Sequence, residues 1–163
     1  DSPVVVRMIE KMLTGAGIEV VTAHDGLEAI ERAFDGDVSL EYVSRLMHRR
    51  YTDSPTIRKV LQTMWYQVNN GQEIWVVGAI LEDKTVRGGT GWGAEFAKLC
   101  NKTLHVFDQE KKGWFWWNGE DWQAPRSPDG PRIMHPHFTG TGTRTLQPAA
   151  SRAIEELFRR PFD

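Results

Sequence analysis

The feature that most restricts the fold of this chain is a continuous apolar run, Ile74-Trp75-Val76-Val77, set between polar segments. Such a run is typical of a strand that is buried on both faces, as in a parallel sheet. The segment before it, residues 55–68, has apolar residues at helical spacing and leads into Asn69-Asn70-Gly71, which ends a helix. After the run come a glycine-rich segment, a helical pattern over residues 94–100 and a second strand over residues 104–108. The order strand, helix, strand predicts an α/β fold.

Two segments rich in glycine and threonine follow predicted strands. The first glycine motif is Gly88-Gly89-Thr90-Gly91-Trp92-Gly93, and the second is Thr139-Gly140-Thr141-Gly142-Thr143-Arg144. Glycine lets the backbone approach a phosphate, and the N-terminus of a following helix supplies unpaired N–H donors and a partial positive charge. In open parallel sheets, ligands bind beyond the carboxyl ends of the strands, where consecutive crossovers diverge. We therefore expect both motifs to meet at that edge, together with Asp108 at the end of its strand.

The residue types in these motifs suit a phosphorylated ligand. Backbone amides and threonine hydroxyls can cradle a phosphate, Arg144 can pair with it bidentately, and Asp108 can accept hydrogen bonds from a ribose. Each role has a structural alternative: glycine clusters before helices are also ordinary turns, Arg144 can pair with a surface carboxylate, and Asp108 can cap a turn. The predicted ligand-binding residues are Gly88, Gly89, Thr90, Gly91, Trp92, Asp108, Thr139, Gly140, Thr141, Gly142, Thr143 and Arg144.

The other segments complete the predicted fold. Helices are expected over residues 3–14, 26–34, 38–50, 55–68, 94–100 and 148–158, and strands near residues 18–22, 73–80, 104–108 and 137–139. Residues 114–122 predict a small Trp-rich hairpin turning at Asn118-Gly119, which either covers the edge of the sheet or offers a stacking platform to a base or sugar. We predict one α/β domain over residues 1–163, three-layered and Rossmann-like or flavodoxin-like, with a short, mainly parallel sheet and helices on both faces.

Composition limits the classes of function. A chain of 163 residues with 40% hydrophobic residues and a formal net charge of −2 favours one compact domain and disfavours disorder or general binding of polyanions. Cys100 is the only cysteine, which excludes an internal disulfide and a cysteine-built zinc site and fits a reducing cytoplasm. His135-Pro136-His137 lacks a third ligand nearby, so no metal site is predicted. No export signal or membrane span is expected, and neither nucleic acid nor a membrane is an expected partner, while a homo-oligomer is compatible with the sequence.

Five blocks of residues, in order and spacing, resemble a known group of proteins. The blocks are Trp65-Tyr66-Gln67-Val68, Val76-Val77-Gly78, Gly88-Gly89-Thr90-Gly91-Trp92, Val106-Phe107-Asp108 and Phe138-Thr139-Gly140-Thr141-Gly142-Thr143-Arg144. Through them residues 54–163 resemble Rossmann-like nucleotide-binding proteins of the LOG and DNA-processing-protein-A type, which include predicted molybdenum-cofactor carriers. The resemblance implies a nucleotide at the glycine motifs. In the phosphoribohydrolase branch a glutamate after the glycine loop helps to cleave an N-glycosidic bond; Glu95 is one residue off that spacing, and Arg87 replaces the preceding proline.

The beginning of the chain carries a second resemblance. Asp1-Ser2-Pro3, Ala16-Gly17, the strand-like residues 18–23 and Asp25-Gly26-Leu27-Glu28-Ala29 resemble response-regulator receiver domains over residues 1–35. In that family Asp1 would belong to the acidic pair that holds magnesium. The family's first strand and its phosphoacceptor strand are missing, so phosphotransfer is not expected. Two unrelated resemblances in one chain indicate a chimera, recombined or engineered, with its join between residues 34 and 54.

These observations lead to one functional prediction with two alternatives. The chain is expected to be a cytoplasmic protein that binds a nucleotide or a phosphorylated nucleoside derivative at its glycine motifs, without catalysis and with no other cofactor. One alternative is a phosphoribohydrolase-like enzyme that uses Glu95 and Arg144. The other is a recombined or engineered scaffold, related to receiver domains, that binds no ligand.

Overall fold

The computed structural model describes residues 38–50, 54–125, 127 and 129–159, together with residues 11 and 14. By its internal contacts the chain divides into two compact units, Asp1–Tyr42 and Val43–Asp163. The second unit contains the sheet and both glycine motifs. Lys11 and Thr14 are helical, but the rest of the helix expected over residues 3–14 lies outside the described residues. The strand expected near residues 18–22 and the helix expected over residues 26–34 lie wholly outside them.

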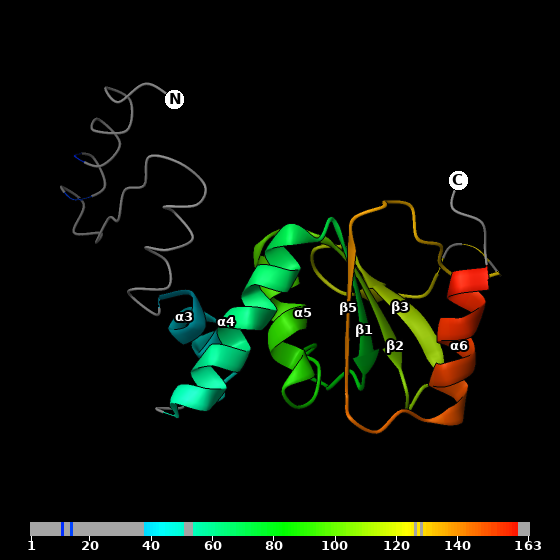
Figure 1. The fold of residues 1–163 in the computed structure, drawn as a ribbon, viewed down its shortest axis with the longest axis horizontal. Coiled ribbons are helices and arrows are strands. Elements are labelled where there is room, and N and C mark those ends of the chain that lie inside the picture. Colours follow the sequence, from blue (N-terminus) through cyan, green and yellow to red (C-terminus); the bar gives the residue numbers. More distant parts are fainter. Residues whose placement is uncertain are drawn as a thin grey trace. The chain divides into compact units, whose positions relative to one another are not determined.

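The core of the second unit is a five-stranded mixed sheet in the order β4-β3-β2-β1-β5. Its central strand β1 (Glu73–Gly78) pairs in parallel with β2 (Thr103–Asp108) on one side and with β5 (Phe138–Gly142) on the other. Beyond β2 the hairpin of β3 (Gly113–Trp117) and β4 (Trp122–Gln123) continues the sheet in antiparallel fashion (Figure 1). The predicted α/β fold with a parallel centre is confirmed, and the Trp-rich hairpin forms one edge of the sheet.

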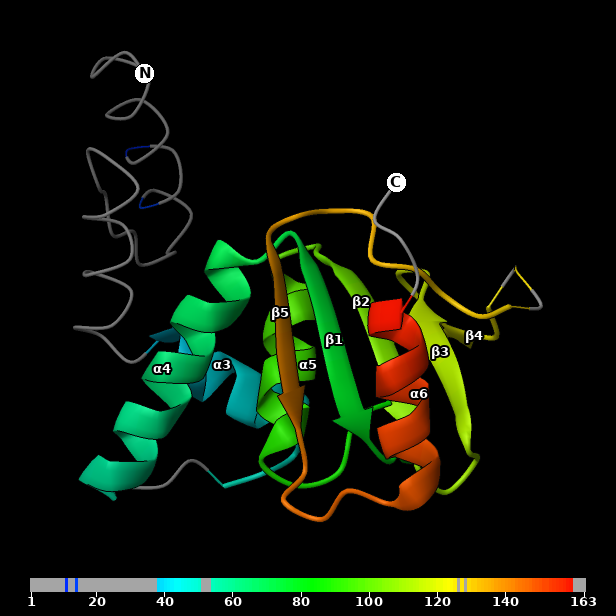
Figure 2. The ribbon, with the colours of Figure 1, turned by 45° about the vertical axis from the view of Figure 1, so that its right-hand side comes forward.

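Helices lie on both faces of this sheet. Helix α5 (Thr90–Leu99) connects β1 to β2 and contacts both of them as well as β5, while α4 (Pro55–Asn70) packs on α5 and reaches β5. Helix α6 (Pro148–Arg159) lies on the opposite face (Figure 2). The remaining described helix, α3 (Val38–Leu46), precedes α4. None of the helices in the described part of the chain combines the length and the apolar character needed to cross a bilayer.

Residues 74–77 of β1 are all apolar because both faces of the strand are covered. Trp75 and Val77 belong to apolar clusters with Leu157 and Ala150 of α6. Side chains alternate along a strand, so Ile74 and Val76, both 0% exposed, face the side on which α5 lies. Burying a side chain of this kind contributes roughly 1.5–3 kcal/mol. The continuous apolar run therefore indicates a strand that is covered on both faces of the sheet.

Two of the predicted elements end before the predicted residue. Helix α3 ends at Leu46, whereas the sequence predicted a helix to residue 50; His48 has a φ of 49°, a left-handed conformation that stops a helix. Strand β1 ends at Gly78, and its expected extension to Ile80 is wrong. There the chain turns away, because the amide of Ile80 donates to Asp108 Oδ2 and Ile80 pairs with Val86 in an isolated antiparallel bridge.

The glycine motifs are less loop-like than the sequence predicted. Helix α5 begins at Thr90 and not at residue 94, so most of the first motif is helical. Its first turn is tight, with the amides of Gly91 and Trp92 donating to the carbonyls of Gly88 and Gly89 over 3.2 and 3.1 Å. In the second motif residues 139–142 belong to β5, and the loop proper starts at residue 143. Three of the six motif glycines, Gly91, Gly93 and Gly142, lie where an added Cβ would come within 3.4 Å of a neighbouring residue, so these three permit close packing.

Candidate functional site

An open cavity of about 700 Å³ lies at the carboxyl ends of β1, β2 and β5. This is the edge at which parallel sheets hold their ligands. Both glycine motifs contribute to its wall, together with α4, the turn after β2 and the loop before α6. Its lining residues are Val60, Met64, Gly78, Ala79, Arg87, Gly88, Gly89, Thr90, Gln109, Glu110, Thr141, Gly142, Thr143, Arg144 and Gln147.

The first motif presents three consecutive amides at the start of α5. Gly88 has a φ of +73°, and Gly89 follows with φ −62° and ψ −34°, so a left-handed residue precedes a right-handed one. Successive residues of opposite hand direct their N–H groups into one concavity that suits an anion. Within the described residues the amides of Gly88, Gly89 and Thr90 donate to no protein acceptor. The partial positive charge at the start of the helix acts at the same place.

Arg49 holds this turn from outside the motif. Its Nη1 donates to the carbonyl oxygen of Gly88 over 2.6 Å, and its Nη2 donates to that of Val86 over 2.8 Å. The hydroxyl of Ser44 donates to the carbonyl oxygen of Arg49 and fixes the backbone that carries it. Sequence reasoning did not identify Arg49, because a contact between residues 39 positions apart leaves no local pattern.

The loop before the motif is fixed by its own polar groups. Asp83 Oδ1 accepts hydrogen bonds from the hydroxyl and the amide of Thr85, over 2.7 and 2.9 Å. These two bonds, the hydroxyl bond first, hold the pKa of Asp83 below its ordinary value. The amide of Leu81 also donates to the carbonyl oxygen of Thr85 over 2.8 Å. The segment that leads from β1 to the first motif is therefore an ordered turn.

Two arginines line the cavity in different states. The guanidinium of Arg87 forms an ion pair with Glu110, so the two charges offset each other. Arg144 is exposed and, within the described residues, makes no hydrogen bond or ion pair. Among the residues that the structure describes, the cavity therefore has one guanidinium, that of Arg144, without a protein partner.

Gln109 holds the loop that carries Arg144. Its Nε2 donates to the carbonyl oxygen of Thr145 over 3.1 Å, and its Oε1 accepts the amide of Gln147 over 2.8 Å. The side chain is 8% exposed, so both bonds are shielded from water. At the start of the same loop, the amide of Thr143 donates to the carbonyl oxygen of Val77 over 3.0 Å.

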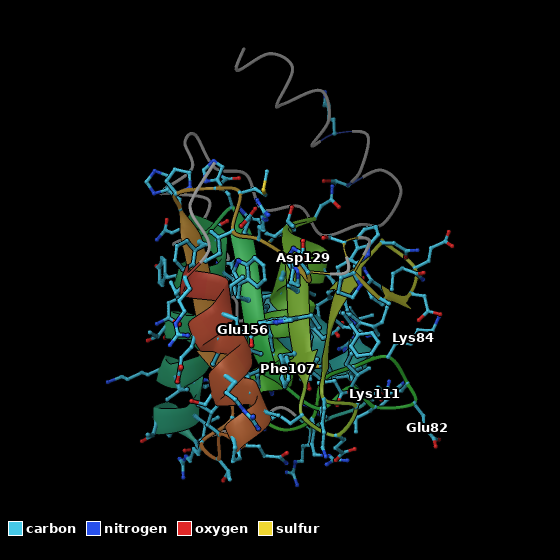
Figure 3. The ribbon with its side chains drawn as sticks, turned by 90° about the vertical axis from the view of Figure 1, so that its right-hand side faces the viewer. Glu82, Lys84, Phe107, Lys111, Asp129 and Glu156 are labelled. Atoms are coloured by element: carbon cyan, nitrogen blue, oxygen red, sulfur yellow. The ribbon has the colours of Figure 1, made fainter. Side chains whose placement is uncertain are left out.

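Asp108 does not line the cavity. Its side chain is 1% exposed, and Oδ2 accepts the amide of Ile80 over 3.1 Å. Oδ1 accepts the amides of Glu110 and Lys111 over 2.9 and 3.1 Å. This is the turn-capping role that was the alternative to binding a ribose, and it joins the loop after β1 to the turn after β2. Figure 3 shows Lys111, whose Nζ lies 3.8 Å from Oδ2, at the side where the hairpin lies.

The predicted ligand-binding residues therefore divide into two groups. Those that line the cavity are Gly88, Gly89, Thr90, Thr141, Gly142, Thr143 and Arg144. Those that do not are Gly91, Trp92, Asp108, Thr139 and Gly140. Trp92 is 8% exposed, and its ring centroid lies 6.3 Å from that of Phe96 on the same helix. The hydroxyl of Thr139, at the other end of β5, donates to the carbonyl oxygen of Gln67 over 2.7 Å.

Glu95, the candidate catalytic residue, also does not line the cavity. Its side chain is 9% exposed, and Oε1 accepts a hydrogen bond from Lys98 Nζ over 2.7 Å. The same ammonium lies 4.0 Å from the ring centroid of Trp117 and 5.1 Å from that of Trp122. Lys98 therefore occupies the aromatic surface of the hairpin that was considered as a stacking platform.

No metal centre is visible in the part of the chain that the structure describes, because it contains no group of three or more His, Cys, Asp or Glu residues placed to share an ion. The ring centroids of His135 and His137 are 5.7 Å apart. Comparison with models of protein families, with curated proteins and with solved structures finds no match for this chain. The functional inference therefore depends on the geometry of the cavity.

Proposed function

We propose that the cavity at the carboxyl edge of the sheet binds a nucleotide or another phosphorylated nucleoside derivative, without catalysing a reaction. The observation that carries the proposal is the convergence of three unpaired amides, Gly88 to Thr90, and the guanidinium of Arg144 on one cavity. The proposal includes the fold class. Parallel β1, β2 and β5 between α5 and α6 support a three-layer, Rossmann-like domain, in which ligands occupy this edge.

The amides and Arg144 suit the phosphate. Hydrogen bonds in which one partner is ionised are about twice as strong as neutral ones, and a guanidinium matches two phosphate oxygens at once. The hydroxyl-bearing side chains of Thr141 and Thr143 line the same cavity and supply further donors. The carboxylate of Glu110 would repel a phosphate, but the positive charge of Arg87 offsets its charge. The electrostatics of this side of the cavity therefore favour binding of an anion.

The remaining space suits a nucleoside. Ligand pockets of proteins usually measure about 300–1,000 Å³, and this cavity, at about 700 Å³, is far larger than a phosphate requires. Val60 and Met64 from α4 give it an apolar wall against which a base can pack. Gln109 and Gln147 also line it.

The lining favours binding over catalysis. Among the lining residues Glu110 is the one carboxylate, and it is held by Arg87. Glu95, on which a phosphoribohydrolase would depend, is paired with Lys98 outside the cavity. No carboxylate of the described residues is thus free within the cavity to act as a general acid or base.

Isothermal titration calorimetry with AMP, adenosine and inorganic phosphate tests the proposal. Wild-type protein is expected to bind AMP more tightly than adenosine, and Arg144→Ala is expected to weaken AMP binding by about 10- to 100-fold, because a hydrogen bond to a charged group contributes about 1.5–3 kcal/mol. Adenosine binding should change little. Arg152→Ala, which removes an exposed arginine of α6 that does not line the cavity, is the matched control.

Three outcomes contradict the proposal. The first is that wild-type protein binds none of the three molecules at millimolar concentration, which would leave the ligand-free scaffold. The second is equal affinity for AMP and adenosine. The third is release of free adenine from AMP, which would show a hydrolase and return catalysis to this cavity.

A further inference from the structure

A second cavity, of about 360 Å³, lies between α6 and the start of the hairpin strand β3. Its floor is apolar: Phe107 of β2 and Leu157 of α6 line it and are 4% and 5% exposed. The ring of Trp114 also lines it and meets the ring of Phe107 edge-on, with centroids 5.3 Å apart. Among the described residues none lines both this cavity and the candidate nucleotide site. The two sites are therefore separate.

Small residues leave this space open. Ala149 and Ala153 are four positions apart on α6, so they lie on the same face of the helix, and both line the cavity. Gly113, the first residue of β3, lines it from the hairpin side. A longer side chain at any of these three positions would extend into the cavity. The apolar floor can therefore accommodate a chain of methylene groups.

Two cationic side chains line the end of the cavity nearest the carboxyl ends of the strands. Lys112 directly precedes β3, and β3 begins beside the last residue of β2. Arg152 lies in the first half of α6, with its Nε 3.4 Å from the carbonyl oxygen of Pro148, the first residue of the helix. The helix begins at the same edge, because Gln147, just before it, lines the candidate nucleotide site. Within the described residues neither cation forms an ion pair.

Two carboxylates line the other end of the cavity. Glu156 is four residues beyond Arg152 on α6, which places it about 6 Å closer to the amino ends of the strands. Asp129 belongs to the loop before β5, and the two residues after it line a further cavity together with Glu73, the first residue of β1. Figure 3 shows Asp129 above Glu156, and both above Phe107. Neither carboxylate has an ion-pair partner in the described part of the chain. The cavity is therefore positive at one end and negative at the other.

We propose that this cavity binds a linear ω-amino acid, a molecule with a carboxylate and an ammonium at opposite ends of a short methylene chain. The carboxylate lies at the end formed by Lys112 and Arg152. The ammonium lies at the end formed by Asp129 and Glu156, and the methylene chain covers the apolar floor. A simple anion or cation would be attracted by one end and repelled by the other. The cavity volume is at the lower end of the range for ligand pockets, which suits a ligand of this size.

Four small molecules test the two charged ends and their spacing. 6-Aminohexanoate carries both charges, hexanoate lacks the ammonium, hexylamine lacks the carboxylate, and glycine carries both charges on a single carbon. Binding to wild-type protein is followed by protein-observed NMR at up to about 50 mM, because exposed charge pairs each contribute little. We expect 6-aminohexanoate to shift the amides of Gly113 and Ala153 and to bind about 2- to 5-fold more tightly than hexanoate or hexylamine. Glycine should leave these amides unshifted.

Two variants at exposed positions of α6 assign the charges. Glu156→Gln keeps the shape of the side chain but removes its charge, so affinity for 6-aminohexanoate should fall about 2- to 5-fold while affinity for hexanoate does not fall. Arg152→Gln should lower affinity for 6-aminohexanoate and hexanoate but not for hexylamine. Glu155→Gln is the matched control, because Glu155 is an exposed carboxylate of the same helix that does not line the cavity.

Three outcomes would overturn the proposal. The first is that 6-aminohexanoate shifts neither amide of the wild-type protein. The second is that hexanoate, hexylamine or glycine binds as tightly as 6-aminohexanoate does. The third is that Glu155→Gln weakens binding as much as Glu156→Gln does. None of these results bears on AMP binding, since the two cavities have separate linings among the described residues.

Discussion

Arg49 Nη1 lies 2.6 Å from the carbonyl oxygen of Gly88, and this bond ties the end of the α3 segment to the start of α5. Together with the bond from Nη2 to Val86, it points two carbonyl groups of the loop toward Arg49. The amides that follow are then left to face the cavity. The geometry of the first glycine motif is thus set by a residue that lies 39 positions before Gly88 in the sequence, with α4 and β1 between them.

Replacing Arg49 should loosen the first motif. Arg49→Met keeps the apolar stem but removes both hydrogen bonds, so we expect the free energy of unfolding to fall by about 1–3 kcal/mol. Hydrogen exchange at the amides of Thr90 and Gly91 should become faster. Urea unfolding measures the first effect and NMR the second. Arg50→Met is the control, because Arg50 is exposed and forms no bond within the described residues; equal effects of the two changes would contradict the role of Arg49.

Two glycines of the first motif should respond oppositely to alanine. At Gly91 a Cβ would lie 2.0 Å from the carbonyl oxygen of Val86 and 2.7 Å from Arg49 Nη1, so Gly91→Ala should lower the free energy of unfolding by about 1–3 kcal/mol. At Gly89 a Cβ would meet nothing within 4 Å, and the backbone is helical. Gly89→Ala should therefore raise stability by about 0.4–1 kcal/mol. Thermal and urea unfolding of the two variants measure both effects. A Gly91→Ala protein more stable than wild type would refute the close packing of Gly91 against Val86 and Arg49.

Asp108 should matter for stability more than for ligand binding. Asp108→Ala removes the acceptor of three amides, of which that of Ile80 is buried, and we expect a loss of about 2–4 kcal/mol in the free energy of unfolding. Asp121→Ala, which removes one acceptor from an exposed turn, should cost less than about 1 kcal/mol. If Asp108→Ala unfolded like wild type but no longer bound AMP, the ribose role would be restored.

His105 should make stability depend on pH. Burial lowers the pKa of its imidazole from 6.5 to about 4. The unfolded chain therefore takes up a proton first as pH falls, so the contribution is fully present above pH 6.5 and is lost between about pH 6.5 and 4. The loss is on the order of 3 kcal/mol. Urea unfolding of wild type and His105→Phe across this range isolates the effect, because carboxylates titrate in both; parallel curves would contradict it.

The sequence predicted the elements whose signal is local. The apolar run of β1 and the apolar spacing of α4 and α6 identify elements that the structure contains, with ends that differ by one or two residues. The start of α5 was predicted four residues late because local patterns treat glycine as a turn former. At Gly93 a Cβ would lie 3.1 Å from Met64 Sδ and 3.3 Å from Thr141 Cγ2, so glycine is required there by neighbours from α4 and β5. Such a requirement arises only once the chain is folded.

In the candidate site, too, some features could be predicted from the sequence and others depend on contacts made only in the folded chain. The two glycine motifs could be predicted to line one cavity, because order along the chain determines which ends of parallel strands meet. The roles of single polar residues could not. Asp108 has the position of a ligand-binding residue but accepts backbone amides, and Glu95 has nearly the spacing of a catalytic residue but pairs with Lys98. Which partner a carboxylate takes depends on contacts that spacing does not encode.

Lys98 gives the folded molecule an unusual chemical property. Its side chain is 13% exposed, and its ammonium donates to Glu95 and to the carbonyl oxygen of Lys84 and lies 4.0 Å from the ring centroid of Trp117. Lys84 and Lys111, by contrast, have side chains that are 49% and 53% exposed (Figure 3). An acylating reagent should therefore modify Lys84 and Lys111 while the protein is folded and reach Lys98 only when α5 and the hairpin separate. Mass spectrometry of the labelled protein would then measure how fast Lys98 is acylated, and that rate would give the rate at which α5 and the hairpin separate.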